Sequence, residues 1–300
     1  MASPPRPLTF RTSPADTARP HYECLVSICV HDAPEFILEQ LRNINEHVPQ
    51  CCIVLHVNSA SLTLDETTLP ANVWLNPQWI PITRSHDPSL MLGFVSNVVH
   101  AYTVATFDRV LFLSSSTLFF RPVVWATFPK TAVCITSIAN PPDTPLTLWD
   151  AQRSSVWWWS TATRDARLLA WMQRKGIARI GGGQISGTLL PESTLADLID
   201  LMAIEETMSH KFDYPVEEIY AQTVGLAFAT AHNLPVFPGL ILTHWFNGED
   251  AYFCRTPFVF DAAEARPSTY GLCKIHPAHG SSMTLLRELQ QRVAAADSSQ

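Results

Sequence analysis

The chain has 300 residues, of which 47% are hydrophobic and 16% are charged, so it can bury a substantial core and does not have the composition of a disordered protein. Its formal net charge of −7 provides no global basic field, which argues against a nucleic-acid partner held by counterion release. The ligand therefore has to be inferred from particular sites and not from the bulk charge.

The first half of the chain alternates strands with helices. Its strands are continuous apolar runs rich in strand-forming residues. The expected strands are Glu23–His31, Cys51–Val57, Val73–Leu75 and Asp108–Ser114, and the expected helices are Glu35–Glu46 and Ser96–Ala105. Strands that are apolar on both sides and alternate with helices predict an α/β fold with a mainly parallel sheet flanked by helices. Such sheets bind ligands at the carboxyl ends of their strands.

The second half has a more mixed pattern. The expected strands are Ala132–Ser137, Gln184–Leu190 and Leu240–Trp245, and the expected helices are Thr163–Arg174, Ser193–Glu205 and Glu217–Val224. Three consecutive glycines at 181–183 predict a turn. We expect a flexible segment at residues 1–20, a single domain at 21–285, and a C-terminal helix and tail at 286–300.

The sequence contains neither an export signal nor a membrane-spanning run. Residues 1–20 are rich in Pro, Arg, Ser and Thr and lack the apolar segment of a signal peptide. No apolar run reaches the roughly 18 residues that a membrane span requires. We therefore expect no transmembrane segment and a soluble chain, with the cytoplasm favoured and the compartment otherwise open.

Several motifs of nucleotide-dependent and hydrolytic enzymes are absent. The turn after the first strand reads His31-Asp32-Ala33-Pro34, without GxGxxG or GKS/T, which argues against a Rossmann dehydrogenase and a P-loop NTPase. There is no GxSxG nucleophile elbow. A metal-dependent GT-A glycosyltransferase carries Asp-x-Asp after a central strand, where this chain reads Ser114-Ser115-Ser116.

Several short segments, in the correct order over about residues 22–277, resemble one family. They are His56-Val57-Asn58-Ser59, Gly93-Phe-Val-Ser96-Asn-Val-Val-His-Ala101, Leu111-Phe-Leu-Ser114, Pro215-Val-Glu-Glu218-Ile-Tyr-Ala-Gln-Thr223 and Tyr270-Gly-Leu-Cys-Lys274-Ile-His. The family is the core-2/I-branching N-acetylglucosaminyltransferases and peptide O-xylosyltransferases, family 14 of the glycosyltransferases, of which this chain resembles a divergent member.

The resemblance implies a GT-A-like fold and an inverting, metal-independent sugar transfer. Residues 21–125 would form the nucleotide-binding half of the domain and residues 126–285 the acceptor and catalytic half. The expected donor is a nucleoside-diphosphate sugar, by preference a UDP-sugar, and the expected acceptor is a hydroxyl of a glycan or glycoprotein. No metal or other cofactor is required in that family.

The residue expected to act as catalytic base is Glu218. In the family, a glutamate that opens a helix deprotonates the acceptor hydroxyl, and the register places it on Glu218. An inverting transferase needs one carboxylate opposite the leaving group to take this proton. The neighbouring Glu217 is the alternative. Taken alone, Pro-x-Glu-Glu is also an ordinary acidic first turn of a helix.

The residues expected to bind the donor are Lys274, Arg255, His31, Asn58 and Ser115. By the resemblance, Lys274 contacts the diphosphate and offsets its developing charge in place of a metal. The second cation is Arg255 or Arg266. Asn58 matches an aspartate that contacts the nucleobase, His31 ends the first strand, and Ser115 lies where the metal ligands of other GT-A enzymes would be.

Two other functions agree with the same pattern. One is a metal-dependent GT-A transferase or nucleotidyltransferase that uses scattered carboxylates such as Asp32, Glu249 and Asp250. The other is a non-catalytic carbohydrate-binding descendant of the fold. The identity of the sugar and of the acceptor is open, because single methylene or hydroxyl groups in the pocket decide it.

Overall fold

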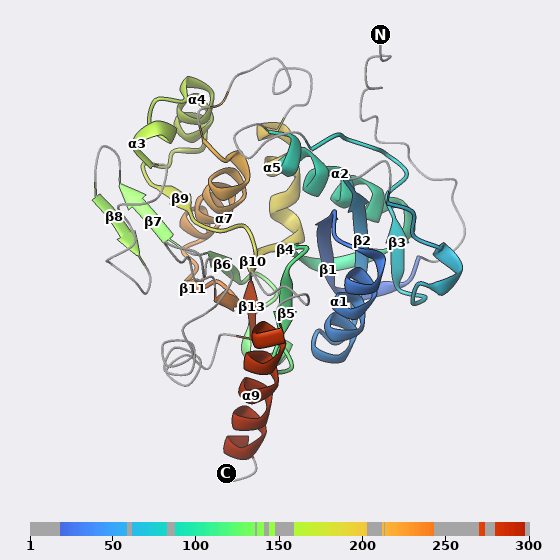
Figure 1. Ribbon diagram of the computed structural model, residues 1–300. Coiled ribbons are helices and arrows are strands. Elements are labelled where there is room, and N and C mark those ends of the chain that lie inside the picture. Colours follow the sequence, from blue (N-terminus) through green and yellow to red (C-terminus); the bar gives the residue numbers. More distant parts are fainter. Residues whose placement is uncertain are drawn as a thin grey trace.

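The computed structural model describes residues 19–58, 62–82, 88–135, 137–140, 144–147, 159–202, 212, 214–242, 270–273 and 280–297. A seven-stranded sheet lies at the centre, in the order β11-β6-β10-β4-β1-β2-β3 (Figure 1). From one edge to the other, its strands are Val236–Pro238, Val133–Ile135, Thr188–Pro191, Thr106–Ser114, His21–Val30, Cys51–Val57 and Val73–Leu75. The fold is therefore α/β, as predicted.

The sheet is mixed and mainly parallel. Strand β1 pairs in parallel with β2 and β4, β3 pairs in parallel with β2, and β11 with β6. Strand β10 is antiparallel to both of its neighbours, β4 and β6. In this register Cys29 of β1 lies opposite His56 of β2 and Ser114 of β4. The carboxyl ends of the three central strands therefore lie side by side. They form the edge of the sheet that is called the edge from here on.

The central strands form because their apolar runs can be buried on both faces. Residues 24–30 of β1 are all buried. Leu25 and Cys29 pack on the face covered by α2, α5 and α7, whereas Val26 and Ile28 pack on the face covered by α1. The bounds of these helices are Ser89–Val104, Leu195–Leu201, Tyr220–Ala231 and Pro34–His47.

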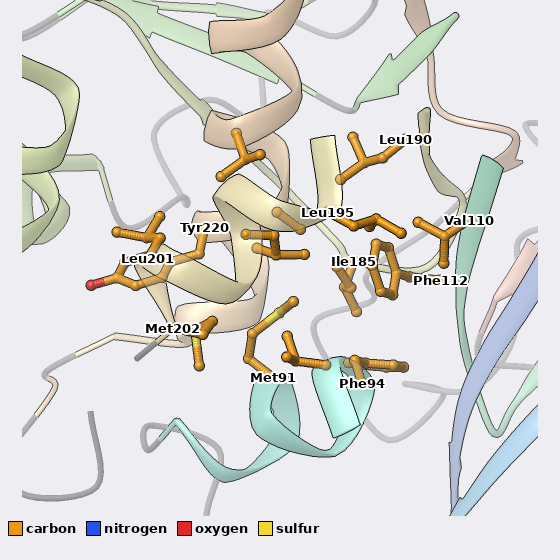
Figure 2. Close-up of a cluster of buried hydrophobic side chains, with 14 of the residues drawn as sticks. Met91, Phe94, Val110, Phe112, Ile185, Leu190, Leu195, Leu201, Met202 and Tyr220 are labelled. Atoms are coloured by element: carbon orange, nitrogen blue, oxygen red, sulfur yellow. The ribbon is translucent and has the colours of Figure 1, made fainter. Parts of the chain in front are cut away.

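The face under α2, α5 and α7 carries the larger apolar cluster. Figure 2 shows Met91 and Phe94 of α2 meeting Phe112 of β4 and Tyr220 of α7. The rings of Phe94 and Phe112 meet edge to face, with centroids 5.6 Å apart. This packing fixes α7, and the segment immediately before it, against the sheet.

The opposite face is covered by α1 and a small three-stranded sheet. That sheet has the order β12-β13-β5, with strands Ile241–Leu242, Gly271–Cys273 and Thr117–Phe119. The side chain of Asn43 on α1 accepts a hydrogen bond from Phe119 N at 2.6 Å and donates one to Phe119 O at 2.9 Å. Gln40 donates to the carbonyl oxygens of Ser114 and Thr117, at 2.9 Å each. Helix α1 thus holds the turn that follows β4.

The remaining elements are short or peripheral. A third sheet has the order β8-β7-β9, with strands Thr144–Thr147, Ser137–Asn140 and Ile180–Gly182. The other helices are α3 Trp159–Ala162, α4 Ala166–Lys175 and α9 Gly280–Asp297, and the 3-10 turns are Glu66–Thr68, Trp125–Thr127, Glu192–Thr194 and Val216–Glu218. Among the described residues, none of the helices has the length and apolar character to cross a membrane.

The sequence predicted the first half of the fold more closely than the second. Strands β2 and β3 have the predicted bounds, but α2 begins at Ser89, before the predicted Ser96, because apolar residues extend its buried face. The predicted turn at 181–183 was wrong in part, since Gly181 and Gly182 belong to β9. The strand predicted from Gln184 begins only at Thr188. Helix α9 begins at Gly280, so the expected boundary at 285 falls inside it.

Gly181 is required because β9 packs directly on the backbone of α7. A Cβ atom at this position would lie 2.5 Å from the carbonyl carbon and oxygen of Gln222. We expect Gly181→Ala to lower the free energy of unfolding by more than about 2 kcal/mol, because backbone atoms cannot rotate away. Urea denaturation measures this change.

The matched control is Gly176→Asn. Gly176 ends α4 with φ of 68°, and no atom lies within 4 Å of an added Cβ. Asparagine tolerates this left-handed conformation, so the control should change the stability by less than about 0.5 kcal/mol. Equal losses in the two variants would contradict the role given to Gly181.

Candidate functional site

The candidate site lies at the edge where β1, β2 and β4 end. Strand β10 runs antiparallel to β4, with Thr188 opposite Phe112, so the residues before Thr188 extend along the end of β4. The hydrogen bond from Gly187 N to Phe112 O, 2.9 Å long, confirms this course. The edge is therefore built from four segments that are far apart in the sequence.

Hydroxyl groups lie at the end of β4 and in the segments beside it. The hydroxyl of Thr117 lies 2.9 Å from that of Ser114 and 2.7 Å from that of Ser186. Ser186 Oγ also accepts a hydrogen bond from Ser114 N at 3.3 Å. This neutral network joins the end of β4 to the segment before β10, and it adds no negative charge to the edge.

His31 and Ser115 come together at this edge. Ser115 Oγ lies 3.4 Å from His31 Nδ1, so the ends of β1 and β4 are bridged by side chains. His31 is exposed, whereas Ser115 is buried. An exposed imidazole beside a buried hydroxyl offers a ligand polar contacts at the mouth of the site.

Glu218 is tied to the same edge by two hydrogen bonds. It ends the 3-10 turn η5, Val216–Glu218, and its side chain accepts a hydrogen bond from Gln184 Nε2. Its backbone oxygen accepts one from Gly183 N at 2.9 Å. Because Gln184 lies two residues before Ser186, these bonds attach Glu218 to the same segment that carries Ser186. The structure therefore brings Glu218 to the ends of the central strands.

The two neighbouring glutamates have different surroundings. Glu217 is buried, and its charge adds to the effect of burial in raising the pKa of the Cys29 thiol, so it lies near the end of β1. Glu218 is half-buried. A base that meets an incoming hydroxyl must be accessible, and this favours Glu218. The predicted helix start at Glu217 was wrong, because α7 begins at Tyr220 after the 3-10 turn.

A buried carboxylate anchors both ends of the segment that bears Glu218. Asp165 accepts hydrogen bonds from the hydroxyls of Tyr214 and Tyr220, and its other oxygen caps α4 at Arg167 N and Leu168 N. Burial, followed by neighbouring charges, raises the pKa of both tyrosines far above its ordinary value. This anchor was not predicted from the sequence, although an aspartate just before a helix is a recognisable N-cap.

Asn58 and His56 hold the loop that follows β3. Asn58 Oδ1 accepts a hydrogen bond from Ile82 N at 2.8 Å, and His56 Nε2 lies 2.8 Å from Ile80 O. Because a carbonyl only accepts, Nε2 of His56 carries the proton. The amide oxygen of Asn58 uses one of its two lone pairs in this bond, and its NH2 group can donate to a ligand.

The two cations expected from the sequence, Lys274 and Arg255, lie outside the described residues, as does Arg266. The described chain nevertheless reaches the edge immediately before Lys274. Cys273 of β13 lies opposite Thr117 in the antiparallel register. Consecutive Cα atoms are about 3.8 Å apart, so the chain passes the hydroxyl network one residue before Lys274.

No protein-family model matches the sequence, and no curated protein matches it either. Within the described ranges, no three His, Cys, Asp or Glu side chains are grouped so that they could hold a metal ion. The expected independence from metal stays a prediction.

A hollow of about 610 Å³ lies away from this edge, between α1, the segment after β5, and α9. Arg42, Arg121 and Arg287 line it, together with Glu39 and Glu46. None of the candidate residues that the structure describes lines it. Because the strand ends, and not this hollow, gather Glu218 and its hydrogen-bond partner, we assign the candidate site to the strand ends.

The buried imidazole of His56 makes the stability of the site depend on pH. Burial lowers the pKa of His56 below its ordinary value of 6.5, against a smaller opposing effect of the Ile80 carbonyl. The unfolded chain binds a proton near pH 6.5 and the folded chain resists it, so stability is lost as the pH falls below 6.5 toward the lowered pKa.

We expect His56→Gln to reduce this pH dependence, because glutamine can still donate to Ile80 O but takes up no proton. Urea unfolding at several pH values between 7 and 5 measures the slope. The control His232→Gln changes an exposed histidine and should retain the wild-type slope. An unchanged slope in His56→Gln would contradict the assignment.

Proposed function

We propose that the protein is an inverting glycosyltransferase of GT-A type that moves a sugar from a nucleoside-diphosphate donor to a hydroxyl of a glycan or glycoprotein. The observation that carries this proposal is the attachment of Glu218 to the edge where β1, β2 and β4 end. Parallel sheets bind their ligands at this edge. The ordered resemblance to family 14 of the glycosyltransferases supports the same function.

Glu218 acts as the base in the proposed reaction. Its carboxylate takes the proton from the acceptor hydroxyl while the hydroxyl oxygen forms a bond to the anomeric carbon. The bond from that carbon to the diphosphate oxygen breaks at the same time, and the oxygen leaves with the electron pair. Attack from the face opposite the leaving group inverts the configuration.

The chain's own groups offset the charge on the leaving diphosphate. Lys274, with Arg255 or Arg266 as the second cation, supplies positive charge to the departing oxygen. The neutral hydroxyls of Ser114, Ser115 and Thr117 add hydrogen-bonding capacity at the same edge without holding a divalent ion by charge. Charge from the chain's cations, together with hydrogen bonds from the hydroxyls, supports a transfer that needs no metal.

Asn58 would contact the base of the expected UDP donor. Its oxygen accepts one hydrogen bond from Ile82 N, and its NH2 group can donate to the base. A carbonyl oxygen of uracil can accept that bond, as can a ring nitrogen of adenine, so this contact does not select the base. His31, at the end of β1, would lie against the nucleoside.

We expect Glu218→Gln to lower kcat/KM for sugar transfer by about 10² to 10⁴, because the amide cannot accept the proton. Release of UDP from a panel of UDP-sugars, with glycan acceptors present, measures the rate. NMR of the anomeric signals shows whether the product is inverted.

Two matched variants control this test. Glu217→Gln changes the neighbouring carboxylate, and Glu66→Gln changes an exposed one in a distant 3-10 turn. Both should retain transfer well above the level of Glu218→Gln. If Glu217→Gln alone abolishes transfer in a folded protein, Glu217 is the base and the assignment to Glu218 is wrong.

Removal of divalent metal should leave transfer unchanged. We expect full activity in excess EDTA, whereas Lys274→Met should reduce kcat/KM by about 10² or more because the leaving group loses its cation. Activity that disappears in EDTA and returns on titration with manganese would support the metal-dependent alternative. Donor binding without any turnover would support the carbohydrate-binding alternative.

A further inference from the structure

Gln184 is buried and lies beside the half-buried Glu218. Its side-chain NH2 group donates a hydrogen bond to Glu218 Oε1, although the two residues are 34 positions apart in the sequence. A glutamine cannot itself remove a proton from a hydroxyl at neutral pH. Its effect on chemistry must therefore act through the carboxylate that it contacts.

The backbone around Gln184 is held by the same elements that carry Glu218. Gln222 of α7 donates to Gly183 O at 2.7 Å and to Gln184 O at 3.1 Å. Gly183 N donates in turn to Glu218 O. Gly183 has φ of 131°, a conformation that other residues rarely adopt. The hydrogen-bonded backbone of residues 183 and 184 thus holds the Gln184 amide and the Glu218 carboxylate together.

The partial burial of Glu218 gives this hydrogen bond a chemical effect. Burial disfavours the charged form of a carboxylate. A hydrogen bond donated to the carboxylate favours its ionised form. The contact from Gln184 therefore favours the ionised form of Glu218.

We infer that Gln184 is a positioning residue that keeps the Glu218 carboxylate ionised and oriented at the ends of the central strands. The catalytic role of Gln184 rests on the proposed function. Its effect on the ionisation of Glu218 can be measured without turnover. The amide of Gln184 fixes the direction of the Glu218 carboxylate through this hydrogen bond. Gln222 acts one step further away, by holding the backbone on which Gln184 is carried.

Carboxyl ¹³C NMR of protein labelled at the glutamate side chains tests the inference. Loss of one signal in Glu218→Gln assigns Glu218, and the pH midpoint of its titration is then measured in each variant. We expect the midpoint to rise by about 1 to 2 pH units in Gln184→Met, because a hydrogen bond to a charged group is lost. Gln184→Glu should raise it further, since a second carboxylate then lies directly against that of Glu218.

The control is Gln173→Met, which changes an exposed glutamine of α4 and should leave the midpoint unchanged. Gln184→Glu preserves the size of the side chain and serves if Gln184→Met does not fold. A midpoint that moves by less than about 0.3 pH units in a folded Gln184 variant overturns the inference.

The results can distinguish an error in the role of Gln184 from an error in the proposed function. If wild-type protein transfers sugar and Glu218→Gln does not, but the midpoint does not change in the Gln184 variants, the proposed function is supported and the positioning role of Gln184 is wrong. If no nucleotide sugar is turned over, the titration still reports the effect of Gln184. Where transfer is measured, the acid limb of the kcat/KM profile should move upward with the midpoint in Gln184→Met, a change that a purely structural role would not produce.

Discussion

The structure depends on the burial of strand β1 on both faces between two parallel neighbours. Its apolar run leaves no polar face to water, so helices must cover both sides of the sheet. Parallel pairing with β2 and β4 then makes three strands end at one edge, where Cys29 lies between His56 and Ser114. The polar residues that follow each strand meet there as a consequence of the register.

The second half of the chain completes this edge through antiparallel β10. Ser186, just before β10, joins the hydroxyls that follow β4, and Gln184 reaches Glu218. The paired tyrosines on Asp165 hold the segment of Glu218 from both sides. Buried polar contacts of this kind specify one arrangement because each unmade hydrogen bond costs about 1 to 3 kcal/mol. The same contacts that order the fold therefore fix the position of Glu218.

The chemistry proposed for this edge follows from the charges that it lacks as well as those that it has. Serine and threonine hydroxyls stand after β4 where a metal-binding pair of aspartates would add two negative charges. A leaving diphosphate at such an edge needs a cation from the chain. Strand β13 ends beside the hydroxyls, because Cys273 lies opposite Thr117. Lys274 is the next residue in the sequence. Glu218 and strand β13 thus belong to separate parts of the second half of the chain.

The sequence by itself determined the strands β2 and β3, the parallel centre of the sheet and the glutamate pair, because long apolar runs and local motifs depend only on neighbouring residues. It did not determine the role of Gly181, whose need for close backbone contact arises from α7, nor the anchor at Asp165. It also could not place Gln184 against Glu218. Contacts between residues 34 positions apart depend on how a strand, a turn and a helix pack together, and only the tertiary structure decides that packing.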